Sequence, residues 1–335
     1  MSGRDAGGGA FWKNRNVFVT GATGFLGSWV VRELNARGAN VTGLVRDVAG
    51  HGRPNPAGDP RLDFTMYGRL EDHATLLRAI NEYEVDTVFH LGAQPIVGIA
   101  NRNPLSTFEA NVRGTWNLLE ACRLVPTVRR VVVASSDKAY GEQPQLPYDE
   151  SMPLQGRHPY DVSKSCTDLI AQTYHNTYGT PVCITRCGNF FGGGDLNWSR
   201  IVPGTIRSAL QGERPVIRSD GTMIRDYVYV RDVALFYLDL AEAMDDARIH
   251  GHAFNYSTES QLSVLAITRL ILEAAGRDDL EPRVLGEVKG EIPHQYLSAA
   301  KAKSMLGWKP RYTIEAALRE TVDWYAGYFA DAGRR

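Results

Sequence analysis

Features of membrane, secreted and disulfide-bonded proteins are scarce in this sequence. Its 335 residues contain no run of about 18 apolar residues, so no membrane-spanning helix is expected. The glycine-rich start of the chain lacks the apolar stretch of a signal peptide, and we expect a disordered tail over residues 1–12. The four cysteines include no Cys-x-x-Cys pair and have no cluster of histidines nearby. We therefore predict reduced thiols, no metal site and a cytoplasmic location.

Neither sign of charge is in excess. Lys and Arg number 37 and Asp and Glu number 38, which gives a formal net charge of −1. Such a chain has no global field that would draw it to nucleic acid or to an anionic membrane, and we predict neither partner. Hydrophobic residues make up 43% of the chain, enough for two domains or for one large domain with an appended lobe.

Strand-like and helix-like segments alternate through the first half of the chain. Short β-rich or apolar runs are separated by longer stretches with helical spacing, and this order predicts a doubly wound parallel sheet of the Rossmann type. The strands are expected at residues 16–20, 41–45, 61–65, 87–91, 130–134 and 182–186, and the helices at 25–37, 70–83, 105–124 and 160–178.

The second half mixes helices with short strands and predicts a smaller α/β lobe. Helical patterns occupy residues 199–211, 233–244, 264–275 and 313–328. Because no linker separates the halves, we expect the lobe to grow out of the first domain. The predicted domains are a dinucleotide-binding domain at 13–188, with returning segments near 226–257, and a substrate lobe at 189–330.

A glycine-rich turn follows the first predicted strand and opens the first helix. Gly21, Gly24 and Gly27 have the spacing Gly-x-x-Gly-x-x-Gly. Glycines at such a turn let the backbone approach a pyrophosphate, whose charge the helix N-terminus favours. The context of strand, turn and helix therefore predicts a site for NAD or NADP.

Arg46 and Asp47, at the end of the second strand, bear on the choice between the two cofactors. Arg46 is suited to the 2′-phosphate of NADP, whereas Asp47 is suited to the ribose hydroxyls of NAD. A solvated ion pair at a strand end is the alternative. The sequence leaves the choice between NAD and NADP open.

Tyr160 and Lys164 form a Tyr-x-x-x-Lys motif. On a helix they lie one turn apart on the same face. An ammonium beside a phenol favours the phenolate, so we expect a lowered pKa for Tyr160 and a general base for a sugar or alcohol hydroxyl.

Ser136, Asp137 and Lys138 follow the apolar strand at 130–134. Ligands of open α/β sheets bind at the carboxyl ends of the strands, so a hydroxyl, a carboxylate and an amine would meet a substrate there. The alternative is a surface ion pair between Asp137 and Lys138.

Further polar residues are weaker candidates. Asn111 lies inside a predicted helix, where it can order a water or support the lysine. Arg225 can clamp a diphosphate or pair with Asp226 at the surface, and Arg200 and Arg218 are alternatives for the same role.

Together these residues resemble the extended short-chain dehydrogenase/reductases that act on nucleotide sugars. The resemblance covers residues 17–328 and includes the segments at 90–95, 111–115, 186–192 and 306–310. It implies the following cofactor-binding residues: Gly21, Thr23, Gly24, Phe25, Leu26, Gly27, Arg46, Asp47, Arg69, Leu70, Leu91, Gly92, Ala93, Gln94, Asn111, Tyr160 and Lys164. The implied substrate-binding residues are Gln94, Asn189, Arg200, Val202, Arg218, Arg225 and Gln295.

Within this family the Asp137-Lys138 pair is most similar to the CDP-glucose 4,6-dehydratases. The resemblance implies Ser136, Asp137, Lys138, Tyr160 and Lys164 as catalytic residues, with Asp137 favoured as acid and Lys138 as base. An epimerase or decarboxylase using the same tyrosine and lysine is an alternative, and a non-catalytic NAD(P) sensor is another. The resemblance also implies a homodimer that packs the helices at 105–124 and 160–178 against a second copy.

Overall fold

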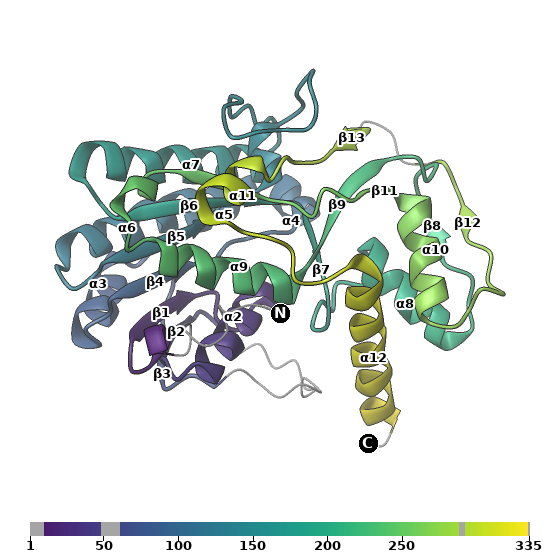
Figure 1. Ribbon diagram of the computed structural model, residues 1–335, viewed down its shortest axis with the longest axis horizontal. Helices are drawn as coiled ribbons and strands as arrows, with labels where there is room; N and C mark the ends of the chain where they lie inside the picture. The colour runs from purple at the N-terminus through teal and green to yellow at the C-terminus, as the bar shows by residue number, and fades with distance from the viewer. Residues whose placement is uncertain (1–9, 48–60, 288–291, 334–335) are drawn as a thin grey trace.

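The computed structural model describes residues 10–47, 61–287 and 292–333. A sheet of seven parallel strands forms its centre, in the order β10-β6-β5-β4-β1-β2-β3 (Figure 1). The chain runs outward from β1 to β3 and then returns to β4 on the other side of β1, which confirms the predicted doubly wound fold. The strands are β1 (Asn16–Thr20), β2 (Asn40–Val45), β3 (Phe64–Tyr67), β4 (Thr87–His90), β5 (Arg130–Ala134), β6 (Val182–Cys187) and β10 (Ala253–Tyr256).

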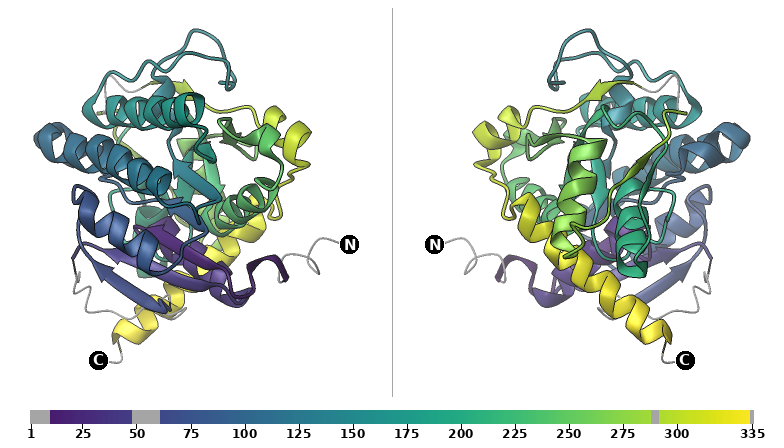
Figure 2. Two further views of the ribbon diagram at one scale, coloured as in Figure 1. Left: turned by 90° about the vertical axis from the view of Figure 1, so that its left-hand side faces the viewer. Right: turned by 90° about the vertical axis from the view of Figure 1, so that its right-hand side faces the viewer.

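Helices cover both faces of this sheet, because its strands carry apolar side chains on both sides. In β1, Val17 and Val19 belong to one core cluster and Phe18, which points the other way, belongs to the second. The first cluster lies under α2 (Phe25–Ala36) and α9 (Val230–Ala243), and the second under the helices of the opposite face (Figures 1 and 2). The opposite face carries α3 (His73–Glu82), α6 (Gly114–Leu124) and α7 (Pro159–Tyr178).

The prediction of a single helix over 105–124 is wrong in one respect. The structure divides it into α5 (Pro104–Phe108), a π-helical turn η1 (Glu109–Arg113) and α6, with α4 (Val97–Arg102) just before. A π turn leaves a backbone carbonyl outside the regular hydrogen-bond ladder. Here the carbonyl of Asn111 accepts from the hydroxyls of Thr115 at 2.6 Å and Thr167 at 3.0 Å, which ties the turn to α7.

The C-terminal half builds a second, smaller α/β region beside the carboxyl ends of the strands (Figure 1). β9 (Ile224–Tyr229) is its central strand, and three short strands pair with it. These are β7 (Asn189–Phe191), β11 (Gln261–Ser263) and β13 (His294–Gln295). Also in this half are α8 (Ile201–Gln211), β8 (Val216–Ile217), η3 (Ala247–Ile249), α10 (Val264–Ala274), β12 (Arg283–Val284), α11 (Ala300–Leu306) and α12 (Ile314–Gly333).

The chain crosses between the two regions more than once. α9 and β10 return to the large sheet, and α11 packs against β10 although it lies late in the sequence. A division into domains at residue 188 therefore stays a prediction. Of the tail expected over 1–12, residues 1–9 lie outside the described residues, whereas Trp12 is fully buried in the core.

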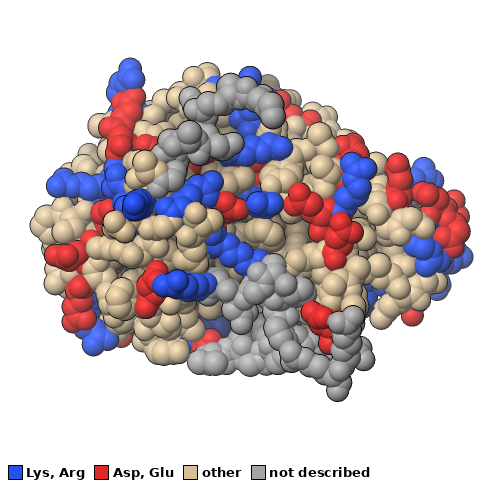
Figure 3. Space-filling model, turned by 60° about the horizontal axis from the view of Figure 1, so that its bottom comes forward, with Lys and Arg blue, Asp and Glu red and all other residues tan. Residues whose placement is uncertain are grey.

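Two surface properties can be compared with the sequence. None of the described helices is long and apolar enough to cross a membrane. On the face that Figure 3 shows, basic and acidic side chains alternate without a large area of one sign. This interspersed pattern agrees with the net charge of −1.

Candidate active site

The glycine turn has a shape that only glycine permits at two positions. Gly21 has a φ of 69°, and a Cβ there would lie 2.9 Å from the Cα of Gly92 at the end of β4. A Cβ on Gly27 would lie 2.0 Å from the carbonyl oxygen of Gly21. The first turn of α2 has no acidic residue and its N-cap, Gly24, offers no side chain to the free N–H groups. These donors fit a dinucleotide pyrophosphate.

Residues after β4 line the same end of the sheet and are tied to the glycine turn. The hydroxyl of Thr20 accepts from the N–H groups of Leu91 at 3.1 Å and Gly92 at 3.0 Å. His90 lies behind them, between Thr20 at 2.9 Å and Thr115 at 3.1 Å. Burial lowers the pKa of His90 to about 3, with Lys164 acting in the same direction, so this imidazole is neutral and structural.

Tyr160 and Lys164 lie near the N-terminus of α7, at the carboxyl end of β5. The ammonium of Lys164 donates to the carbonyl of Ala134, the last residue of β5, at 2.7 Å. Burial lowers the pKa of Lys164 to about 8, while nearby Asp168 acts in the opposite direction. Lys164 therefore joins α7 to β5, the strand that leads to Ser136.

The expected lowering of the Tyr160 pKa is wrong. Desolvation by the surrounding protein raises the pKa of Tyr160 to about 12, and Asp137 acts in the same direction. A hydrogen bond with Ser136 and the charge of Arg200 oppose this rise. The sequence argument failed because the ammonium of Lys164 is engaged by a carbonyl and desolvation is the larger effect.

Asn111 supports α7 and does not lie on the exposed surface of its own helical turn. Its Nδ2 donates to the hydroxyl of Ser163 at 2.9 Å, and that hydroxyl donates to the carbonyl of Tyr160 at 2.7 Å. Its Oδ1 accepts from the N–H of Gln94 at 2.7 Å. Asn111 thus fixes the segment after β4 against the first turns of α7.

Ser136, Asp137 and Lys138 form the turn η2 (Asp137–Tyr140) directly beyond β5. The hydroxyl of Ser136 accepts from the N–H of Lys138 at 3.2 Å and donates to the carboxylate of Asp137 at 3.0 Å. Asp137 is 4% exposed, so this carboxylate is not a surface group. The structure therefore brings Ser136, Asp137, Lys138 and Tyr160 together at one end of the sheet.

A buried ion pair behind this turn was missed by the sequence reasoning. Arg186 of β6 binds Asp168 of α7 through two hydrogen bonds, at 2.7 and 3.0 Å, and donates to the hydroxyl of Tyr140 at 2.8 Å. Asp168 lies one turn after Lys164, and an arginine within a strand predicted to be buried was the available signal. The pair holds η2, α7 and β6 together.

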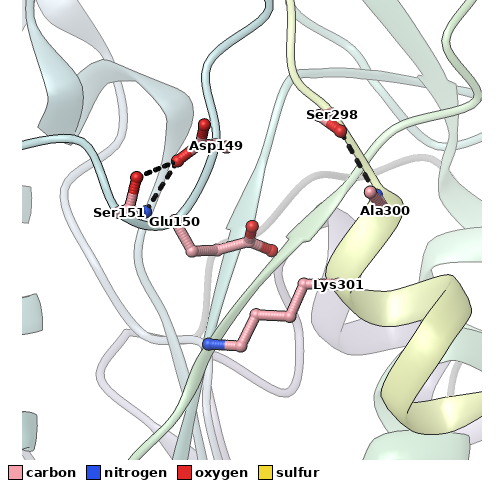
Figure 4. A pocket seen from close by; sticks show the side chains of 6 residues that line it. All are labelled: Asp149, Glu150, Ser151, Ser298, Ala300 and Lys301. Atoms are coloured by element: carbon pink, nitrogen blue, oxygen red, sulfur yellow. Dashed lines mark hydrogen bonds between the residues drawn. The ribbon is translucent and has the colours of Figure 1, made fainter.

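The network continues to a pocket on the far side of η2. Tyr140 donates to Asn255 at 2.7 Å, and the backbone N–H of Asn255 donates to Glu150 at 2.7 Å. Glu150 and Lys301 point into a shared cavity of about 510 Å³ (Figure 4). Burial raises the pKa of Glu150 and lowers that of Lys301. This pocket contains none of the predicted catalytic side chains.

The end of β2 is open to solvent. Arg46 binds its neighbour Asp47 at 2.6 Å, and their side chains are 61% and 64% exposed. Arg69, nearby, binds Glu71 at 3.2 Å, and Leu70 is buried beneath. Arg46, Asp47 and Arg69 are exposed and their ion pairs with neighbouring residues favour neither cofactor, so the choice of cofactor stays open.

Four of the predicted substrate residues form two pairs, and two more lie apart from them. Arg200 binds Asp195 at 3.1 Å and Arg218 donates to the carbonyl of Ser199 at 3.0 Å, both next to the start of α8. Arg225 and Gln295 instead lie buried at the junction of β9 and β13. Asn189 is exposed at the start of β7, whereas Val202 is buried in α8. Contact of these residues with a substrate stays a prediction.

The fold and the site together define a dinucleotide-binding α/β protein of the short-chain dehydrogenase/reductase type. The model of the NAD dependent epimerase/dehydratase family matches residues 17–256, and the chain belongs to this family. It is an enzyme family of nucleotide-sugar dehydratases and epimerases, which confirms the resemblance found in the sequence.

Individual relatives lie in both branches of the family. The chain is 31% identical to the CDP-glucose 4,6-dehydratase of Salmonella typhimurium, over 95% of this chain and 92% of that protein. It is 29% identical to the dTDP-glucose 4,6-dehydratase of Streptomyces venezuelae, crystallised with NAD bound, with a TM-score of 0.79 over 93% of this chain and 97% of that one. It is also similar to the UDP-glucose 4-epimerase of Thermotoga maritima, with 28% identity and a TM-score of 0.82 over 94% and 99% of the two chains.

Proposed function

We propose that this protein is an NAD(P)-dependent 4,6-dehydratase of a nucleoside-diphosphate hexose such as CDP-glucose. The observation that carries the proposal is the placement of Asp137 and Lys138 directly after Ser136, at the end of β5 and against α7. Loss of water across C5 and C6 of a sugar needs one group to take a proton and another to give one. An enclosed carboxylate and an amine side by side supply such a pair.

Oxidation at C4 comes first in this mechanism. Bound NAD or NADP would supply the acceptor that takes a hydride from C4 and later returns it to C6. Tyr160 must be ionised to act here, and as the phenolate it takes the proton of the C4 hydroxyl while Ser136 holds the same oxygen. Lys164 would hold the ribose of the nicotinamide nucleotide, and the N–H groups after Gly24 would hold the pyrophosphate.

Elimination follows because a 4-keto group makes the proton on C5 acidic. Lys138, as the neutral amine, takes this proton, and Asp137, as the protonated acid, gives its proton to the hydroxyl that leaves C6, so that water is released and the two groups are left as ammonium and carboxylate. Asp137 is enclosed and the amine of Lys138 donates to the side chain of Gln295, and both properties suit groups that must move protons at one place. Arg200 and Arg218, beside each other near α8, bind the diphosphate.

A 4-epimerase is the second candidate, and the similarity to the Thermotoga maritima epimerase favours it. It would use Tyr160 and Lys164 in the same way and would leave Asp137 and Lys138 without a chemical role. A non-catalytic sensor would need none of these residues. The enclosed acid and the neighbouring amine therefore favour the dehydratase.

Assembly as a homodimer is part of the same proposal. Large apolar side chains are exposed on the helices expected to pair, including Leu105, which is 70% exposed, and Leu169, which is 52% exposed. Trp116 and Tyr178 on the same helices are also exposed. Light scattering of Leu169→Glu should show monomers where the unaltered protein forms dimers, and equal masses for both would contradict the pairing.

The function is tested by incubating the purified protein with CDP-, dTDP-, UDP- and GDP-hexoses, with NAD or NADP added, and measuring product mass. Loss of one water from one donor supports the dehydratase and names its nucleotide. Unchanged mass with a new sugar isomer supports the epimerase instead. No change with any donor or cofactor contradicts both enzymes.

A further inference from the structure

A short segment of the C-terminal region passes directly beside the catalytic turn. β13 pairs with β9 in parallel register, with Gln295 opposite Arg225. Beyond it, the carbonyl of Tyr296 accepts from the N–H of Tyr148 at 2.9 Å, and the N–H of Leu297 donates to Asp226 at 2.7 Å. The backbone on both sides of Gln295 is therefore fixed to two different parts of the fold.

Both polar atoms of the Gln295 side chain are used by the Asp137-Lys138 pair. Its Oε1 accepts a hydrogen bond from the Nζ of Lys138, and its Nε2 donates to the carbonyl of Asp137 at 3.2 Å. The residue is 0% exposed, so its side chain is enclosed by the protein. Gln295 therefore contacts the turn η2 although it lies almost 160 positions after Lys138 in the sequence.

A neutral amide suits this position. The amide oxygen accepts from one N–H of Lys138 and so fixes the orientation of the amine, including the direction of its lone pair. It does this without adding negative charge. Acidic side chains already lie close, Asp137 in the same turn and Asp161 in α7, where burial raises the pKa of Asp161 and Lys138 opposes this rise. A third carboxylate in place of the amide would hold the lysine in its charged form.

We propose that Gln295 is a positioning residue for water elimination, which directs the Nζ of Lys138 toward the C5 proton of the sugar. This proposal rests on the proposed dehydratase function and deepens it. Gln295 belongs to the second region of the fold, so the lobe expected to bind the substrate also completes the catalytic pair.

The first experiment separates the two chemical steps. Gln295→Met keeps the length of the side chain and removes both hydrogen bonds. In single turnover with the donor identified by mass, we expect water loss to slow about 10²-fold, whereas reduced nicotinamide forms within about twofold of the normal rate and accumulates. Water loss at the normal rate, or equal slowing of both steps, would overturn the proposal.

Gln143→Met is the matched control. The Nε2 of Gln143 donates to the carbonyls of Tyr140 at 2.6 Å and Pro153 at 3.1 Å, so it supports the same turn from the other end without contacting Lys138. We expect its two steps to keep their normal ratio. An elimination defect in Gln143→Met as large as that in Gln295→Met would assign the effect to general disturbance of the turn and overturn the proposal.

Gln295→Glu gives a readout that a purely structural role would not change. The glutamate is the same size and can accept from Lys138, but its charge holds the ammonium. We expect the pH profile of water loss to move to higher pH, with the rate recovering in alkaline buffer. The charged neighbours Asp137 and Asp161 are unchanged in this variant. A profile that coincides with that of the unaltered protein would count against the proposal.

A second measurement needs no substrate. Lys138 is partly exposed, so its rate of acetylation by acetic anhydride can be followed by mass spectrometry relative to exposed Lys13 in the same molecule. Loss of the hydrogen bond in Gln295→Met should speed the labelling of Lys138 several-fold and leave Gln143→Met unchanged. Equal labelling in all three proteins would disprove the contact, whereas failure of every sugar donor would disprove only the dehydratase.

Discussion

Two pairs of oppositely charged neighbours, Asp137-Lys138 and Arg46-Asp47, each lie at the carboxyl end of a strand of the same sheet. In sequence they give the same signal. In the structure Asp137 is 4% exposed and its neighbour is held by Gln295, whereas the side chains of Arg46 and Asp47 are 61% and 64% exposed and bind each other. The first pair is enclosed by distant parts of the chain, and the second is not.

The difference teaches that the surroundings, and not the residue types, decide what a charged pair can do. β5 ends between β4 and β6, next to α7 and the second region, so a group beyond it is enclosed on several sides. β2 lies nearer the edge, and only β3 lies beyond it. Charges in water are screened and contribute little, whereas enclosed charges act strongly on their neighbours.

The largest expected effect comes from making the same substitution in both pairs. Lys138→Met should slow water loss by about 10³-fold because it removes a group that moves a proton, and it should leave dinucleotide affinity unchanged. Arg46→Met should leave water loss within about threefold of normal at saturating cofactor. Product mass spectrometry under single turnover gives both rates, and similar losses in the two variants would remove the contrast.

Stability should show the same contrast. Asp168→Asn leaves Arg186 buried without its carboxylate, and we expect the free energy of unfolding to fall by about 3–5 kcal/mol. Asp47→Asn, at the exposed pair, should change it by less than about 0.5 kcal/mol. Urea unfolding followed by circular dichroism measures both, and equal effects would contradict the comparison.

The pH dependence of stability should reveal the buried carboxyl of Asp226 in β9. Burial raises the pKa of Asp226 to about 7, although Leu297 and Ser257 donate to it. Between its ordinary value of 3.8 and about 7 the folded protein binds more protons than the unfolded chain, so stability falls as pH rises through this range. Asp226→Asn should flatten that fall.

The exposed Asp246 is the control for this measurement. Its pKa is lowered to about 2 by Arg248, so its contribution is present above 3.8 and is lost only as pH falls below that value. Urea unfolding at a series of pH values should therefore show that Asp246→Asn has the same dependence of unfolding free energy on pH as the unaltered protein between pH 3.8 and 7. An unchanged slope in Asp226→Asn would show that this carboxyl titrates normally.

The smallest effect concerns the choice of cofactor. If the exposed guanidinium of Arg46 meets a 2′-phosphate, Arg46→Met should weaken NADP about tenfold and NAD hardly at all. Isothermal titration with each dinucleotide measures this. Equal effects on both would assign Arg46 to adenine or to solvent, and weakening of NAD alone would point to a ribose contact.

Local patterns were sufficient for the elements that surround the cofactor end of the sheet. The alternation of apolar runs and helical spacing predicted the parallel sheet, because strands buried on both faces must be apolar throughout. The strand expected at 61–65 was displaced, since β3 begins at Phe64. The π turn at Glu109–Arg113 gave no pattern, because it depends on hydroxyls of another helix.

The sequence by itself determined the doubly wound sheet and the glycine turn, because each follows from local spacing, whereas the meeting of Ser136 with Tyr160 was implied by the family resemblance. Only the tertiary structure decided which charges are enclosed and what they contact. The partners of Lys138 and Arg186 lie far away in sequence, at Gln295 and Tyr140. Burial and such distant contacts set how strongly a charge acts, and no local pattern records them.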